Sequence, residues 1–137
     1  MEEPRMTRFA TMTLPEHPTV VAPDGSDVRV LLGLAGGGLA HFQLAAGATS
    51  RAVRHQTVEE IWYVLAGRGE MWRSQDGHDE VVSIGPGTCL TIPLGTTFQF
   101  RSLAGLLSVV AVTMPPWPGD DEAVLVDGYP AWEPRSA

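Results

Sequence analysis

Turn-forming residues interrupt this chain about every ten residues, and this spacing constrains the fold more than any other feature of the sequence. The turn signals are PDGSD (23–27), AGGG (35–38), AAG (45–47), AGRG (66–69), QDGH (75–78), GPG (85–87), PLGT (93–96) and LAG (103–105). Between them lie short apolar runs that are typical of strands, such as EIWYVLA and LLSVVAVTM. No window combines a sustained helical period with caps at both ends. The pattern predicts an all-β fold.

The run EIWYVLA has two apolar faces. Successive side chains of a strand point to opposite faces, so Glu60 and Trp62 share one face with Val64, while Ile61, Tyr63 and Leu65 share the other. A strand that is apolar on both faces is covered on both. The cover of the outer face can be a second sheet, a terminal arm or a partner subunit. We expect a homodimer with twofold symmetry.

Composition excludes several functional classes. The 137 residues suffice for one domain with a substantial core. A net charge of −7 argues against binding to nucleic acid, which needs a cationic surface. No apolar run is long enough to span a membrane, and the N-terminal residues lack the apolar core of a signal peptide. A single cysteine suits a reducing compartment, so we expect a cytoplasmic protein.

Two longer segments carry a family resemblance. EEIWYVLAGRGEM, followed by GPGTCLTIPLGTTFQFRS, resembles the two sequence motifs of the cupin superfamily. The resemblance implies a jelly-roll barrel, also called a double-stranded β-helix, with its core at about residues 28–114. We therefore expect residues 1–137 to form a single cupin domain, with terminal arms at 1–27 and 115–137. The arm segment PPWPGDDEAV is distinctive, but the sequence assigns it no role.

The motifs depart from those of metal-binding cupins, in which the resemblance implies three histidines and a glutamate. With Glu60 as the carboxylate, the two histidine positions of the first motif fall on Arg54 and Gln56. The longer spacing moves them to Val53 and His55, and the histidine position of the second motif falls on Phe98. Because transition metals need three or four good donors, we expect neither a tightly bound metal nor another cofactor.

The remaining residues of the motifs predict a different site. Glu60 opens an apolar strand and faces inward, where desolvation raises the pKa of a carboxyl group, and His55 precedes it at the barrel mouth. These two residues are the candidate catalytic pair; the alternatives are a structural hydrogen bond for Glu60 and a loop position for His55. The candidate ligand-binding residues are aromatic side chains with a few polar neighbours: His41, Gln43, Arg54, Gln56, Trp62, Phe98 and Phe100. His41 and Gln43 belong to this set only if they point inward, and the aromatic rings can instead simply fill the core.

These residues predict a small-molecule-binding cupin with an aromatic barrel pocket and without a tightly held metal. It is either a binding module or a metal-independent enzyme of the isomerase or cyclase type, in which Glu60 and His55 move protons. The alternative is a metal-dependent cupin enzyme, of the dioxygenase or isomerase type, with an atypical ligand set of His, Glu and Gln. A third possibility is a structural subunit with a solid barrel. The identity of the ligand is not encoded in the fold.

Overall fold

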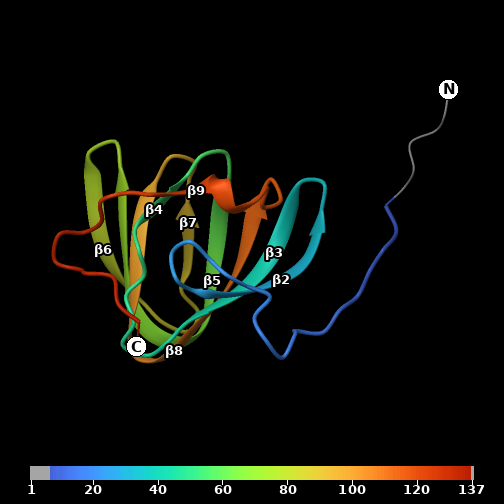
Figure 1. Cartoon of the computed structure of the whole chain (residues 1–137), viewed down its shortest axis with the longest axis horizontal. Coiled ribbons are helices and arrows are strands. Elements are labelled where there is room, and N and C mark those ends of the chain that lie inside the picture. Colours follow the sequence, from blue (N-terminus) through green and yellow to red (C-terminus); the bar gives the residue numbers. More distant parts are fainter. Residues whose placement is uncertain (1–6, 137) are drawn as a thin grey trace.

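The computed structural model describes residues 7–136, and nearly all of their regular structure is β-strand. Figure 1 shows the strands curled into a barrel, with the C-terminal segment running along its outside. In chain order the elements are β1 Val20–Val21, β2 Asp27–Leu34, β3 Gly37–Leu44, β4 Val53–His55, β5 Glu59–Gln75, β6 His78–Ile84, β7 Cys89–Ile92, β8 Thr97–Met114, the 3₁₀ turn η1 Asp120–Glu122 and β9 Ala123–Leu125. The all-β prediction is confirmed. No helix in residues 7–136 is long and apolar enough to cross a membrane.

Two long strands, β5 and β8, build both walls of the barrel. Residues 59–66 of β5 pair with 108–114 of β8, and residues 68–74 of β5 pair with 97–104 of β8. The first pairing lies in a sheet of order β1-β2-β3-β8-β5-β7, which we call the first sheet. The second lies in a sheet of order β9-β4-β8-β5-β6, which we call the second sheet. All of these pairings are antiparallel.

Two of the segments that the sequence predicted as turns are instead bends inside these strands. The AGRG stretch lies within β5, where the register with β8 shifts between Val64 and Gly69, and the LAG stretch lies within β8. Gly67 has a φ of 81°, and a Cβ at this position would lie 2.6 Å from the carbonyl oxygen of Leu106. A Cβ on Gly69 would collide with the carbonyl oxygen of Arg101. Glycine here allows the strand to bulge and bend from one sheet into the other without reversing direction.

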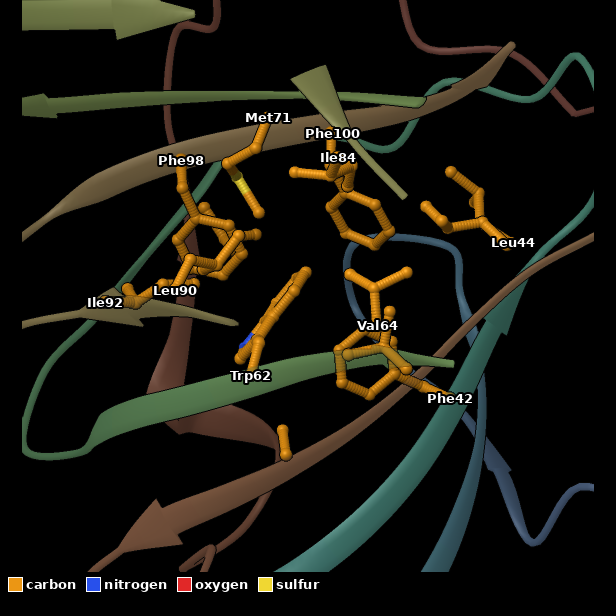
Figure 2. Packing of buried hydrophobic residues seen from close by; sticks show 14 of the residues in the cluster. Phe42, Leu44, Trp62, Val64, Met71, Ile84, Leu90, Ile92, Phe98 and Phe100 are labelled. Carbon is orange, nitrogen blue, oxygen red and sulfur yellow. The ribbon is translucent and has the colours of Figure 1, made fainter. Parts of the chain in front are cut away.

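The barrel interior is filled by apolar side chains from both sheets. Trp62 lies at its centre, with ring centroids 4.5 Å from Phe42, 5.7 Å from Phe98 and 5.1 Å from Phe100, all in edge-to-face geometry. Figure 2 shows these rings among Met71, Ile92 and their neighbours, facing one another inside the barrel. Edge-to-face pairs of this kind are the favoured arrangement of buried aromatic rings. The aromatic interior predicted from the sequence is present, and it is closely packed.

The C-terminal segment covers the outer face of the second sheet. Trp72 points outward from β5 and is buried against Trp132 and Ala52. Gln99, also on the outer face, is 1% exposed; its Nε2 donates to the carbonyl oxygens of Ser50 and Trp132, and its Oε1 accepts from the backbone N–H of Tyr129. A terminal arm therefore covers the second sheet, whereas the face for which the three covers were expected, that of Ile61, Tyr63 and Leu65, belongs to the first sheet.

We predict that Gln99→Leu loosens this segment. The substitution keeps the volume of the side chain but leaves the N–H of Tyr129 without its acceptor, so it should cost about 2–3 kcal/mol of unfolding free energy. Chemical denaturation measures the loss, and faster hydrogen exchange at the amide of Tyr129 locates it. Gln75→Leu, at the exposed end of β5, is the matched control. Equal stability of the two variants would contradict the anchoring role of Gln99.

The residues that the structure describes leave part of the outer face of the first sheet open to solvent. Ile61, Tyr63 and Leu65 are 40%, 48% and 46% exposed, whereas the alternate residues Trp62 and Val64 are buried. The alternation read from the sequence is therefore correct, and the first sheet presents an apolar outer face to solvent.

Candidate functional site

Two short segments place a histidine and a glutamate at the barrel mouth. His55 ends β4, where Val53 and His55 point inward and Arg54 points outward. Glu60 is the second residue of β5 and shares the inner face with Trp62 and Val64. His55 is 5% exposed and Glu60 is 8% exposed. Strand alternation thus turns both ionisable side chains into the barrel.

The two side chains face each other in apolar surroundings. Nδ1 of His55 and Oε1 of Glu60 are 3.6 Å apart, which is too long for a normal hydrogen bond. The Nε1–H of Trp62 donates a long bond of 3.4 Å to the same Oε1 of Glu60. Nδ1 of His55 has no hydrogen-bond partner among the described residues, although the atom is buried. The rings of Phe98 and Trp117 pack edge-on against the imidazole, at centroid distances of 5.2 and 5.0 Å.

Burial shifts both groups toward their neutral forms. Desolvation raises the pKa of Glu60 from 4.5 to about 8, against a smaller lowering by the Trp62 hydrogen bond. Desolvation lowers the pKa of His55 from 6.5 to about 4, against a smaller raising by the charge of Glu122. At pH 7 the site therefore holds a protonated carboxylic acid beside a neutral imidazole, so the close pair is not an ion pair.

These donors do not fit a transition metal. His55 and Glu60 supply one nitrogen and one carboxylate, and the phenyl ring of Phe98 packs on the imidazole where a further ligand would stand. Arg54 and Gln56 point away and are exposed. Among residues 7–136, no three His, Cys, Asp or Glu side chains lie together in a way that would hold a metal ion. Two donors fall short of the three or four that zinc and related metals take from proteins.

The predicted ligand-binding residues divide between three places. Trp62, Phe98 and Phe100 line the interior but pack against one another, with exposures of 0–2%. Arg54 and Gln56 lie on the outside of the mouth. His41 and Gln43, which were included on the condition that they point inward, point outward, because Phe42 and Leu44 of the same strand occupy the core. Gln43 instead bonds Arg29 and Ser108 on the outer face of the first sheet.

The outer-face position gives His41 a different environment from the one expected. The side chain is 7% exposed, and its Nδ1 has no hydrogen-bond partner within residues 7–136. Desolvation, with a contribution from the nearby Arg29 charge, lowers its pKa below 6.5. The alternation of Phe42 and Leu44 with His41 was a signal in the sequence that could have excluded an inward histidine.

Two residues of the C-terminal segment, Trp117 and Glu122, complete the site, although neither was among the candidate site residues predicted from the sequence. Trp117 covers His55, and Glu122 fastens the segment to the β4–β5 loop. The carboxylate of Glu122 accepts from the backbone N–H groups of Thr57 and Val58, the latter at 2.6 Å, and from the hydroxyl of Thr57 at 2.8 Å. These contacts span more than 60 residues of sequence, so no local pattern could have revealed them.

A surface cleft of about 380 Å³ opens beside this fastening. The lining residues come from the β4–β5 loop and the C-terminal segment: Gln56, Thr57, Pro118, Gly119, Asp121 and Glu122. A second cleft, of about 240 Å³, lies between the β5–β6 hairpin and the β7–β8 loop, and its lining residues Thr91 and Pro93 flank Ile92, the β7 partner of Glu60. Neither of these two clefts in the described chain is lined by Trp62, Phe98 or Phe100. The first cleft is thus bounded by the loop that follows His55 and by the residues that follow Trp117.

The two curved antiparallel sheets, joined through β5 and β8 around one aromatic core, define a protein of the double-stranded β-helix class. Residues 40–112, more than half of the chain, match the cupin domain family. The chain belongs to the cupin family. No curated protein sequence matches it closely.

Several solved structures share this fold. Ectoine synthase from P. lautus is 19% identical with a TM-score of 0.70, over 86% of this chain and 90% of that protein. Streptomyces PAC13, solved with uridine, is 19% identical with a TM-score of 0.67, over 88% and 92%. KdgF from Halomonas sp. is 17% identical with a TM-score of 0.64, over 80% and 97%. At these identities the similarity establishes the fold and no more.

Proposed function

We propose that this cupin binds a small organic ligand at the barrel mouth and transforms it by acid–base chemistry, without a tightly held metal. The observation that carries the proposal is the buried pair of Glu60 and His55, in which both groups are neutral and Nδ1 of His55 lacks a partner. Burying two ionisable groups with only one long hydrogen bond, from Trp62 to Glu60, is costly to the fold. Groups with such shifted pKa values concentrate at functional sites.

The protonation states suit proton transfer within one ligand. Glu60 is protonated at pH 7 and donates a proton, while the neutral imidazole of His55 accepts one. A ligand that contacts both groups loses a proton to His55 and gains one from Glu60, so the net change is an isomerisation, a cyclisation or an elimination. The return of the proton from His55 to Glu60 restores the starting state. No redox partner or metal is needed for such a step.

The ligand class follows from the space available. Because the interior rings are packed together, a ligand enters at the cleft beside Thr57 and Gly119 and displaces the Trp117 ring to reach His55. The volume of about 380 Å³ suits a small organic molecule. The presence of uridine in the PAC13 structure supports a ligand of this size in a barrel of this kind.

The proposal predicts how two isosteric variants differ. In a thermal-shift screen of small organic compounds that includes uridine, compounds that stabilise the wild type should also bind Glu60→Gln, within about tenfold. For any compound that is turned over, Glu60→Gln should lower kcat by about 10²–10⁴ with little change in KM, because general acid catalysis contributes that much. Glu59→Gln, one residue away and exposed, is the control. A wild type that binds no compound, or a Glu60→Gln variant with normal kcat, would contradict the proposal.

Elemental analysis tests the part of the proposal in which the protein acts without a tightly held metal. Protein purified without added metal should contain far less than one equivalent of any transition metal, and a chelator should leave its thermal stability unchanged. Stoichiometric metal that is lost in His55→Phe would overturn this part and favour the metal-dependent alternative.

One observation favours a second function, that of a non-catalytic structural subunit. The rings of Trp62, Phe98 and Phe100 are 2%, 2% and 0% exposed and contact one another, as in an ordinary core. In that case the double variant His55→Phe, Glu60→Leu should be more stable than the wild type. It should also still bind any partner protein that the wild type binds. The two functions therefore differ in whether any ligand shifts the resonances of Trp117 and His55.

The exposed outer face of the first sheet supports a homodimer in which each copy is a single domain. Ile61, Tyr63 and Leu65 form an apolar surface on a chain that is otherwise acidic, and such surfaces commonly mark an interface. A twofold axis over this face would pair it with itself. The single cysteine, Cys89, is an exposed free thiol, which suits a reducing cytoplasm.

A further inference from the structure

The N-terminal arm, residues 7–14, extends away from its own barrel. Figure 1 shows the chain leaving the body of the molecule before it reaches β1. Phe9 is 101% exposed, and Met12 and Leu14 are 40% and 47% exposed. No residue of the arm makes a backbone hydrogen bond to the rest of the described chain. An extended segment with its apolar side chains in water lacks the contacts that would fix its conformation.

The root of the arm is fixed on the outer face of the first sheet. Arg29 of β2 donates from Nε to the carbonyl oxygen of Pro15 at 2.8 Å and from Nη2 to that of Glu16 at 3.0 Å. Arg29 lies opposite His41 of β3 and also bonds Gln43, both of which are outer-face residues. The arm therefore leaves the molecule beside a surface that residues 7–136 leave exposed.

That surface is apolar, like the side chains that the arm exposes. It comprises side chains from three neighbouring strands, which we call the apolar face: Leu39 of β3, Ile61, Tyr63 and Leu65 of β5, and Val110 and Val112 of β8. The arm sequence between Phe9 and Pro15 contains no charged residue, in a protein of net charge −7. Nδ1 of His41, on the same side of the sheet, has no partner among residues 7–136.

We infer that in the homodimer, which rests on the function proposed above, the arm of each copy lies across the apolar face of the other. The eight residues of the arm reach about 26 Å when extended. The strands β2, β3, β8 and β5 span about 15–20 Å at the usual strand spacing. The arm is therefore long enough to cross the whole face of a partner, and it is directed away from its own.

Twofold symmetry makes the exchange reciprocal. Each dimer then contains two copies of the arm–face contact, in addition to whatever the faces contribute directly. Two copies of an acidic chain repel each other at long range. The contact between the arm and the apolar face involves no charged side chain of residues 9–15, so it can hold the two copies together despite this repulsion. The exposed rings and methyl groups of the arm and of the apolar face are removed from water in a single step.

The arm variant Phe9→Asp tests the inference by its effect on the dimer. Analytical ultracentrifugation of the full chain should show a dimer, and Phe9→Asp should raise its dissociation constant at least tenfold. Tyr63→Asp, on the apolar face, should have an effect of the same size. Leu94→Asp introduces the same charge at an exposed leucine in the β7–β8 loop and should leave the dimer unchanged. Circular dichroism should show an intact barrel in each variant, because all three sites are exposed.

A photoreactive phenylalanine analogue at position 9 shows where the arm lies. Irradiation of the dimer should join two chains, and peptide mapping should place the link on β5, β8 or β3 of the other copy. The same analogue at position 94 should give no such link. If the full chain is monomeric, the homodimer proposal fails and the exchange with it. If the chain is dimeric but Phe9→Asp leaves the dimer unchanged, or if the link forms within one chain, the exchange fails and the homodimer stands.

Discussion

Replacing Glu60 by glutamine should remove a loss of stability that the wild type shows between pH 6.5 and 8. The pKa of Glu60 is raised from 4.5 to about 8 in the folded protein, so the carboxyl group is protonated when folded and ionised when unfolded throughout that range. The folded state then binds one proton more than the unfolded state, and stability falls as pH rises. At about 1.4 kcal/mol per pH unit, the wild type should lose about 2 kcal/mol over this window.

The histidine produces the opposite slope at lower pH. The pKa of His55 is lowered from 6.5 to about 4, so between these values the unfolded state holds a proton that the folded state lacks, and stability falls as pH falls. Between pH 4.5 and 6.5 the opposite effects of Glu60 and His55 on the pH dependence of stability cancel. The Glu60→Gln variant loses only the glutamate contribution, so its stability should rise from pH 4 to 6.5 and then stay level. Relative to the wild type, the variant should gain about 4 kcal/mol between pH 4.5 and 8.

Urea denaturation at a series of pH values measures both curves. Glu59→Gln is the control, because Glu59 is exposed, and it should follow the wild type. A wild-type stability that is level from pH 6.5 to 8 would mean that Glu60 is ionised in the folded protein. It would then not be the proton donor that the proposed chemistry needs.

The local pattern of the sequence was sufficient to orient β5. Alternation predicted that Glu60 and Trp62 share one face of the strand and that Tyr63 lies on the other, and the structure agrees. The same rule, applied to LAHFQLA, would have turned His41 outward, because Phe42 is the larger apolar residue on the opposite face. Period-two alternation is a strictly local property, so sequence analysis recovers it well.

Glycine signals were less informative because their meaning depends on the partner strand. AGRG satisfies the composition of a turn, yet Gly67 and Gly69 serve a bend at which β5 passes close to the backbone of β8. A tight turn and a bulged bend both need residues without a Cβ. Only the pairing of β5 with β8 distinguishes them, and that pairing is not written in the local sequence.

The cover of the site was the least predictable part, because it is made by distant segments. Trp117 and Glu122 come from a segment with weak patterning, and Gln99 appeared to be an ordinary polar residue of a strand. Each gains its role from contacts across 30 to 65 residues of chain. Burial of a polar side chain against distant backbone groups has no periodicity, so a single sequence does not disclose it.

Replacing Glu122 by alanine should both destabilise the protein and uncover the acid–base pair. The Glu122 carboxylate is 5% exposed, and the buried N–H of Val58 donates to it at 2.6 Å. Without the carboxylate this N–H has no acceptor, and the loop at Thr57 is no longer joined to the C-terminal segment. Loss of the charge-assisted bonds, together with the buried N–H left without an acceptor, should lower the free energy of unfolding by about 3 kcal/mol. This corresponds to about 10 °C in Tm.

The contribution of Glu122 depends on pH with a definite sign. Burial alone would raise the pKa of Glu122, but the hydrogen bonds from Thr57 and Val58 outweigh it and hold the pKa below 4.5. Its stabilising effect is therefore complete above pH 4.5 and is lost as pH falls through the folded-state pKa. Below that pH the stabilities of Glu122→Ala and the wild type should converge.

The pKa of His55 then reports whether the mouth has opened. Two effects of Glu122→Ala oppose each other, since loss of the carboxylate charge lowers the pKa of His55 and entry of water raises it. Desolvation is the larger influence on this histidine, so release of the segment that carries Trp117 should raise its pKa from about 4 toward 6.5. NMR titration of the imidazole measures the shift, and Asp121→Ala, an exposed neighbour, is the matched control. If the pKa stays near 4 in Glu122→Ala while the stability falls, Glu122 supports the loop without holding the mouth closed, and the route of the ligand past Trp117 must be sought elsewhere.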